Sequence, residues 1–166
     1  MDVRANGASW RAGLSKVAEL EQVYIIADMS VDARASDVWA VIGAFSDPAL
    51  GKGFVSDVTG EGEGVGALRT LHLLPELGGG KVVERQTARD DRGYYYAYEL
   101  EDPGGLPFVD YYASAQVAPV DANRCRVIWI NRYRVEAERA HDMRKQSAML
   151  LEMIEANLKS EFAGRR

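Results

Sequence analysis

The chain has 166 residues, of which 47% are hydrophobic and 27% charged, and its formal net charge at pH 7 is −5. This length and composition predict one globular domain with a real hydrophobic core and exclude bulk disorder. The acidic balance argues against general binding to nucleic acid or to an anionic membrane surface.

Residues for metal, thiol or histidine chemistry are scarce. Cys125 is the one cysteine, and His72 and His141 are the two histidines. These numbers exclude an internal disulfide and leave little for a zinc site or a histidine-based triad. We therefore expect no metal site, and the reactions considered below require no organic cofactor. No apolar run approaches the ~20 residues of a membrane span, and residues 1–20 lack the apolar core of a signal peptide, so we expect a cytoplasmic protein.

The first part of the chain predicts an extension, one strand and two short helices. Residues 1–20 are interpreted as an N-terminal extension, with a short amphipathic helix over 9–20. The β-rich run 23–31 predicts a strand. Asp32 or Ser36 then caps a short helix that ends before Pro48, because proline cannot continue a helix.

The middle of the chain alternates short apolar runs with clusters of Gly, Asp and Pro. This pattern predicts an antiparallel meander, whose expected strands are 54–59, 66–74, 81–89, 94–100, 110–118 and 124–134. Residues 136–162 contain no Gly or Pro and carry an apolar stripe, which indicates one long amphipathic helix. The fold class is therefore α+β. A curved sheet needs its inner face covered, and one helix covering it leaves room for a cavity.

Several segments, taken together in their order along the chain, resemble the START-like superfamily, and more narrowly its bacterial polyketide cyclase/dehydrase branch, often labelled SRPBCC. The resemblance covers about residues 22–162 and rests on the segments 31–39, 64–69, 83–85, 90–91, 106–111, 125–129 and the last helix. It implies a helix-grip fold in residues 21–163. In that fold a seven-stranded antiparallel sheet wraps around the C-terminal helix, with two short helices after the first strand, and encloses an apolar pocket. Members include lipid carriers, hormone receptors, relatives of the birch-pollen allergen, norcoclaurine synthases and polyketide cyclases.

One segment is similar to part of the plant abscisic-acid receptors. The run Pro48–Phe54 resembles the receptor segment that places a lysine in the pocket, which here is Lys52. Arg69 and Glu84 stand at matching spacing and are implied to face the same pocket. The gate and latch sequences of the receptors are absent, so only the pocket positions are carried over.

Alternation along the strands extends these positions to their neighbours. With Glu84 facing inward, Val82, Gln86 and Ala88 follow it, whereas Arg85 and Arg89 turn outward. The same logic, with the stripe of the last helix, gives the expected substrate-binding residues: Arg69, Leu71, Tyr96, Tyr98, Trp129, Asn131, Met143, Ser147 and Leu150.

Lys52, Glu84 and Tyr111 are the candidate catalytic residues. A desolvated lysine or carboxylate can exchange protons near neutral pH, and a tyrosine hydroxyl can donate to a developing oxyanion. The equally weighted alternative is that Arg69 and Glu84 form a structural ion pair while Lys52 reaches solvent.

The leading hypothesis is a cofactor-independent cyclase, dehydratase or lyase acting on an aromatic or polyketide-like molecule. The alternative is a non-catalytic carrier or sensor of a hydrophobic small molecule, and a weaker third is a module that helps a partner protein. The expected partner is a hydrophobic or aromatic small molecule, and a homodimer is left open.

Overall fold

Seven strands form one antiparallel sheet in the computed structural model, which describes residues 18–164. The spatial order is β1-β7-β6-β5-β4-β3-β2. The strands are β1 (Leu20–Val31), β2 (Val55–Glu61), β3 (Leu68–Leu73), β4 (Lys81–Asp90), β5 (Tyr95–Asp102), β6 (Val109–Asp121) and β7 (Arg124–Glu136). The expected seven-stranded antiparallel sheet is confirmed: β2 to β7 form the predicted meander, and β1 pairs with β7. Most strands are one to three residues longer than predicted.

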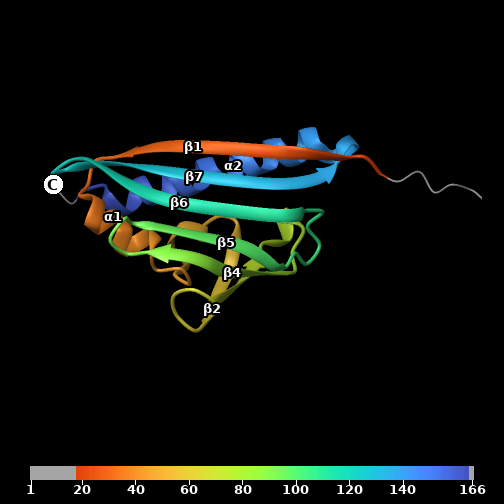
Figure 1. Ribbon diagram of the computed structural model, residues 1–166, viewed down its shortest axis with the longest axis horizontal. Coiled ribbons are helices and arrows are strands. Elements are labelled where there is room, and N and C mark those ends of the chain that lie inside the picture. The colour runs from red at the N-terminus through yellow and green to blue at the C-terminus, as the bar shows by residue number, and fades with distance from the viewer. Residues whose placement is uncertain (1–17, 165–166) are drawn as a thin grey trace, which may run out of the picture.

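Helix α2 (Ala137–Phe162) runs along one face of this sheet, behind β1 and β7 in Figure 1. We call this face the concave face. The side chains that α2 buries are Ala140, Ser147, Leu151, Ile154, Leu158 and Phe162. Their spacing is the three-and-four pattern of an amphipathic helix, which confirms the expected packing. Leu151, rather than the predicted Leu150, lies on the fully buried stripe, and Leu150 is partly buried.

Two short helices follow β1, as expected. Helix α1 (Ala35–Ile42) buries Val38, Trp39 and Ile42, while η1 (Pro48–Gly51) is a single 3-10 turn. Asp47 begins this turn, because its carboxylate accepts a hydrogen bond of 2.8 Å from the backbone N–H of Ala49. A second 3-10 turn, η2 (Pro75–Leu77), lies between β3 and β4.

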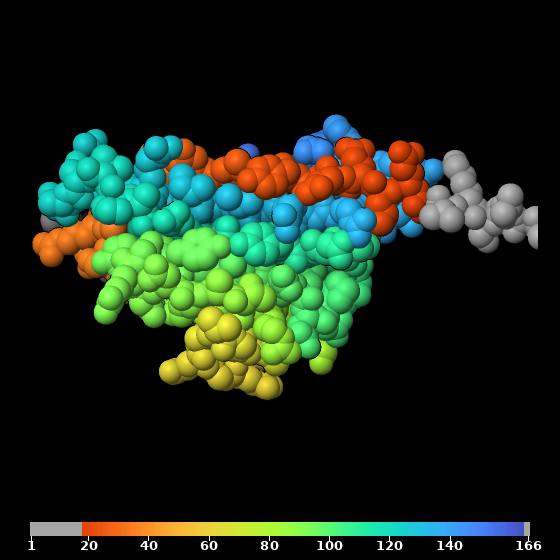
Figure 2. All heavy atoms as spheres, in the orientation of Figure 1, coloured from red at the N-terminus to blue at the C-terminus, as the bar shows by residue number. Residues whose placement is uncertain are grey.

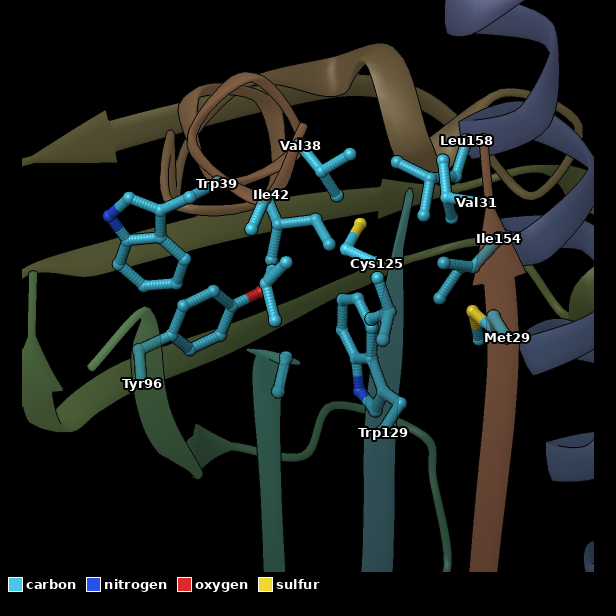
Figure 3. Packing of buried hydrophobic residues seen from close by; sticks show 14 of the residues in the cluster. Met29, Val31, Val38, Trp39, Ile42, Tyr96, Cys125, Trp129, Ile154 and Leu158 are labelled. Carbon is cyan, nitrogen blue, oxygen red and sulfur yellow. The ribbon is translucent and has the colours of Figure 1, made fainter. Parts of the chain in front are cut away.

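The core lies between α1, α2 and the concave face. In the close view of Figure 3, Trp39 lies above Tyr96, and Met29 of β1 packs beside Ile154 of α2. The ring centroids of Trp39 and Tyr96 are 6.0 Å apart. These four residues and Trp129 belong to one buried cluster, so α1 and α2 share a single core.

Strand β4 contains a bulge that reverses which side chains face inward. Gln86 is opposite Tyr98, but Ala88 is opposite Ala97 and Arg89 is opposite Tyr96. One extra residue in a strand moves every later side chain to the other face. Arg89 therefore shares the concave face with Tyr96, and the prediction that Ala88 points inward and Arg89 outward is wrong.

The outer face of the sheet faces the viewer in Figure 2, from β1 across β7 and β6 to β5. Charged pairs lie on it, including Arg126 with Asp28 and Arg134 with Asp110. Tyr24 and Ile26 of β1 are also exposed there. Among residues 18–164, no helix has the length and apolar character needed to cross a membrane.

The N-terminal boundary of the domain stays a prediction. Most of the helix expected over 9–20 lies outside the described residues. Leu20 begins β1, and the carbonyl of Glu19 accepts a hydrogen bond of 2.9 Å from the backbone N–H of Ala137. The chain is therefore attached to the start of α2 from residue 19 onward.

Candidate functional site

A buried ion pair joins β3 to β4 on the concave face. Arg69 and Glu84 are register partners, and the Nε of Arg69 donates to the carboxylate of Glu84. Their side chains are 13% and 6% exposed. Two charges this deep are tolerated only when each compensates the other, so the structural ion pair considered from the sequence is present.

The guanidinium of Arg69 is also held between two aromatic rings. It lies 4.2 Å from the ring centre of Phe45 and 4.7 Å from that of Tyr98, and its Nη1 donates to the carbonyl of Phe45 at 2.9 Å. Burial lowers the pKa of Arg69, but the carboxylate of Glu84 together with the neighbouring Tyr96 and Tyr98 more than offsets that effect, and the net pKa is raised. Arg69 is thus a fixed cation, already satisfied by its neighbours.

Tyrosine hydroxyls lie beside this pair. The hydroxyl of Tyr98 accepts a hydrogen bond of 3.3 Å from Nε1 of Trp129, and the ring of Tyr111 lies 6.3 Å from that of Tyr98. Burial raises the pKa of both Tyr98 and Tyr111. Both hydroxyls therefore remain protonated at neutral pH, where they act as hydrogen-bond donors.

A bulge in β6 brings Tyr111 to this position. Asp110 and Tyr111 together stand opposite Tyr133, and the φ angle of Asp110 is 52°. The rings of Tyr111 and Tyr133 are stacked at 6.0 Å. The hydroxyl of Tyr133 in turn bonds to Ser147 of α2 at 2.9 Å. These contacts join the concave face to the predicted helix residue Ser147.

Four of the predicted binding residues line one small cavity between α1, η1 and the concave face: Arg69, Leu71, Tyr96 and Trp129. The volume of this cavity is about 50 Å³. Such a space holds only a few water molecules. A larger guest therefore requires neighbouring side chains, such as the partly buried Leu50 and Phe54, to move.

The other predicted residues take several positions. Asn131 is buried on β7, and Met143 packs beside Tyr133 at the start of α2. Lys52 is exposed, which differs from the expectation that its ammonium projects into the pocket. The physical reason is that residues 48–51 form a 3-10 turn, and the carbonyl of Lys52 accepts a hydrogen bond of 2.8 Å from the side chain of Asn157, which holds this turn to α2.

Sequence reasoning did not include Gln86 and Phe45 among the site residues. Gln86 is fully buried, and in the described part of the chain neither polar atom of its side chain has a hydrogen-bond partner. The sequence did indicate the direction of Gln86, because it lies two residues after the inward Glu84 and side chains alternate along a strand. Phe45 follows α1 and had no signal, because its contact with Arg69 depends on how α1 packs on the sheet.

Arg89, brought inward by the β4 bulge, fastens the end of α1 to the sheet. Its guanidinium binds Asp91 and donates to the carbonyl of Gly43 at 2.8 Å, while Nε1 of Trp39 donates to Asp91 at 3.1 Å. Arg89 also lies 5.2 Å above the Trp39 ring. This cluster forms one wall of an open groove of about 910 Å³ beside the β2–β3 turn. The two charged residues of the cluster, Arg89 and Asp91, are paired with each other.

Nowhere in 18–164 do three or more His, Cys, Asp or Glu side chains gather closely enough to hold a metal ion.

Comparison with known proteins gives one family and many structures. Residues 25–162 match the family described as polyketide cyclase / dehydrase and lipid transport. No curated protein matches the chain. A truncated norcoclaurine synthase from Thalictrum flavum superposes with a TM-score of 0.74 at 17% identity, over 89% of this chain and 97% of that one.

Two further solved structures are similar. Norcoclaurine synthase from Thalictrum flavum in complex with dopamine and hydroxybenzaldehyde has a TM-score of 0.72 at 18% identity, over 100% of this chain and 98% of that one. A protein from Thermobifida fusca has a TM-score of 0.69 at 26% identity, over 86% and 93% of the two chains. At these identities the synthases show a shared fold, which is the expected helix grip.

Proposed function

This chain belongs to the polyketide cyclase/dehydrase and lipid transport family, and from that membership we propose that it holds one hydrophobic or aromatic small molecule against the concave face, in the interior that α1, η1 and α2 enclose. The observation that carries the proposal is an interior lined by aromatic rings together with buried side-chain amides, of which both polar atoms of Gln86 and the oxygen of Asn131 have no hydrogen-bond partner among the described residues. Such a mixture of apolar walls and a few convergent polar groups is typical of small-molecule sites.

The middle of the concave face supports this proposal. Ala113 and Ala115 occupy successive inward positions of β6, between Tyr98 and Tyr96 on one side and Asn131 and Trp129 on the other. These two methyl groups project less far into the interior than the rings on either side of them, and both are fully buried. A planar guest would lie over them with rings on either side.

The arrangement of charges favours a carrier or sensor over an acid–base enzyme. The carboxylate of Glu84 is engaged by Arg69, and Lys52 is exposed. Neither group stands free in the interior as a base, which proton abstraction from a bound substrate requires. We therefore place the non-catalytic alternative first.

Cyclisation or dehydration of an aromatic or polyketide-like compound is the second candidate function. It is favoured by the protonated hydroxyls of Tyr98 and Tyr111 close to Glu84, because such hydroxyls can stabilise a developing enolate or phenolate oxygen. If this candidate holds, Tyr111→Phe should lose at least tenfold in turnover while binding is retained. If no bound compound is converted, the carrier or sensor reading stands.

Filling the cavity should prevent binding. Leu71→Trp replaces a cavity-lining side chain by a larger one, and we expect it to weaken binding of the neutral dye N-phenyl-1-naphthylamine at least tenfold in a fluorescence titration. The control is Leu68→Trp on the same strand, where the register partner is the outward Arg85, and its affinity should match the parent. A parent protein that does not bind the dye, or equal affinities in all three, would contradict the proposal.

A cytoplasmic location and a homodimer stay predictions from the sequence, and neither is needed for this proposal.

A further inference from the structure

Two buried side-chain amides on the concave face have polar atoms without partners among the described residues. Both Nε2 and Oε1 of Gln86 are unpaired, as is Oδ1 of Asn131. Gln86 is 0% exposed and Asn131 is 7% exposed. A buried amide without a hydrogen bond is destabilising, so native proteins seldom keep one unless something else satisfies it.

The two amides lie on one row across the sheet. Gln86 stands opposite Tyr98, Tyr98 opposite Ala113, and Ala113 opposite Asn131. Three steps between strands of about 4.8 Å each span roughly 14 Å along the sheet, and less across its concave face. The row therefore presents hydrogen-bonding groups at both ends, with the hydroxyl of Tyr98 and the small Ala113 between them.

The charges on this face are already compensated. Arg69 is paired with Glu84, and Arg89 is paired with Asp91. The groups that remain for a ligand on the row are neutral, and each amide can both donate and accept hydrogen bonds. A carboxylate placed there would be buried without a free cation, which is far more costly than burying a ketone or a phenol.

We infer that the interior site selects uncharged molecules with a hydrogen-bonding group at each end, such as hydroxyaryl ketones, and rejects carboxylates of the same shape. This inference rests on the proposed function, because it specifies the ligand of the same site. Gln86 and Asn131 are the residues that set the selectivity, one at each end of the row.

The test compares two nearly isosteric probes by calorimetric titration at pH 7. They are 6-hydroxy-2-acetylnaphthalene, which is neutral, and 6-hydroxy-2-naphthoate, in which a carboxylate replaces the acetyl group. We expect the ketone to bind at least ten times more tightly. Equal affinities, or tighter binding of the carboxylate, would overturn the inference.

The variants Gln86→Leu and Asn131→Leu remove the amides with little change of side-chain volume. Each should weaken binding of the ketone about three- to tenfold, the loss expected for one or two neutral hydrogen bonds, and narrow the preference over the carboxylate. Gln86→Leu should also raise the Tm of the ligand-free protein by about 2–4 °C, because it removes a buried amide that lacks partners. Gln116→Leu, at an exposed position on the outer face of β6, is the matched control.

The outcomes separate this inference from the proposed function. If N-phenyl-1-naphthylamine binds but Gln86→Leu and Asn131→Leu leave the affinity for the ketone unchanged, the amides serve only an internal water and the inference fails alone. If the dye does not bind to the parent protein, the proposed function fails and the inference fails with it.

Discussion

Glu84→Leu should lower the free energy of unfolding by about 3–5 kcal/mol, because it leaves the guanidinium of Arg69 buried without its carboxylate. The double variant Arg69→Met/Glu84→Leu should recover much of this loss and lie within about 1–3 kcal/mol of the parent. It does not recover everything, because the carbonyl of Phe45 loses the donor that Arg69 supplies. Urea denaturation followed by circular dichroism measures all three proteins.

The chain supplies a matched control for this cycle. Arg85 and Glu101 form an equivalent pair between β4 and β5, but their side chains are 40% and 47% exposed. Breaking that pair with Glu101→Leu should cost far less stability than Glu84→Leu, because solvent screens it. Equal costs for Glu84→Leu and Glu101→Leu would show that the Arg69–Glu84 pair is not desolvated as the structure indicates.

Raising the pH above about 10 should unfold the protein steeply. Burial raises the pKa of Tyr96 and Tyr98 in the folded state, so their hydroxyls stay protonated there after they have ionised in the unfolded chain. A raised folded-state pKa contributes stability that is present below the unfolded pKa and lost as the pH rises. Each such tyrosine lowers the free energy of unfolding by about 1.4 kcal/mol per pH unit, so the two together remove about 3 kcal/mol per unit.

The buried thiol of Cys125 also contributes to the loss of stability at alkaline pH, beginning at a lower pH than the tyrosines. Burial raises the pKa of Cys125 to about 11, so its contribution is lost between the ordinary thiol value and pH 11. Urea midpoints measured from pH 8 to pH 12 give the profile. Tyr98→Phe should reduce the slope above pH 10 by about 1.4 kcal/mol per pH unit, the contribution of one buried tyrosine. A profile that is identical in Tyr98→Phe and the parent would contradict the expectation.

Much of the fold could be predicted because a half-buried strand alternates strictly and a surface helix repeats every three or four residues. Fixing Glu84 as inward gave Gln86 the same direction, and both are buried. The same rule failed three residues later at Arg89, because the extra residue in β4 leaves no mark in the hydrophobic pattern.

The candidate site was harder to predict than the fold. Lys52 was placed in the pocket by resemblance alone, and its position depends on the 3-10 turn of η1 and on Asn157 of α2, which is more than a hundred residues away in the chain. The cavity of about 50 Å³ is likewise a property of how side chains from four or more elements fill space. No pattern along one strand determines that volume.

At Ala113 and Ala115, the pairing of the strands and the volume of the interior depend on different groups. The hydrogen-bonded ladder of β6 depends on its backbone, while the room inside depends on rings carried by other strands. Exchanging one such ring for a shorter side chain would enlarge the chamber without disturbing the pairing of any strand. The volume of the interior can therefore change by single substitutions while the architecture stays the same.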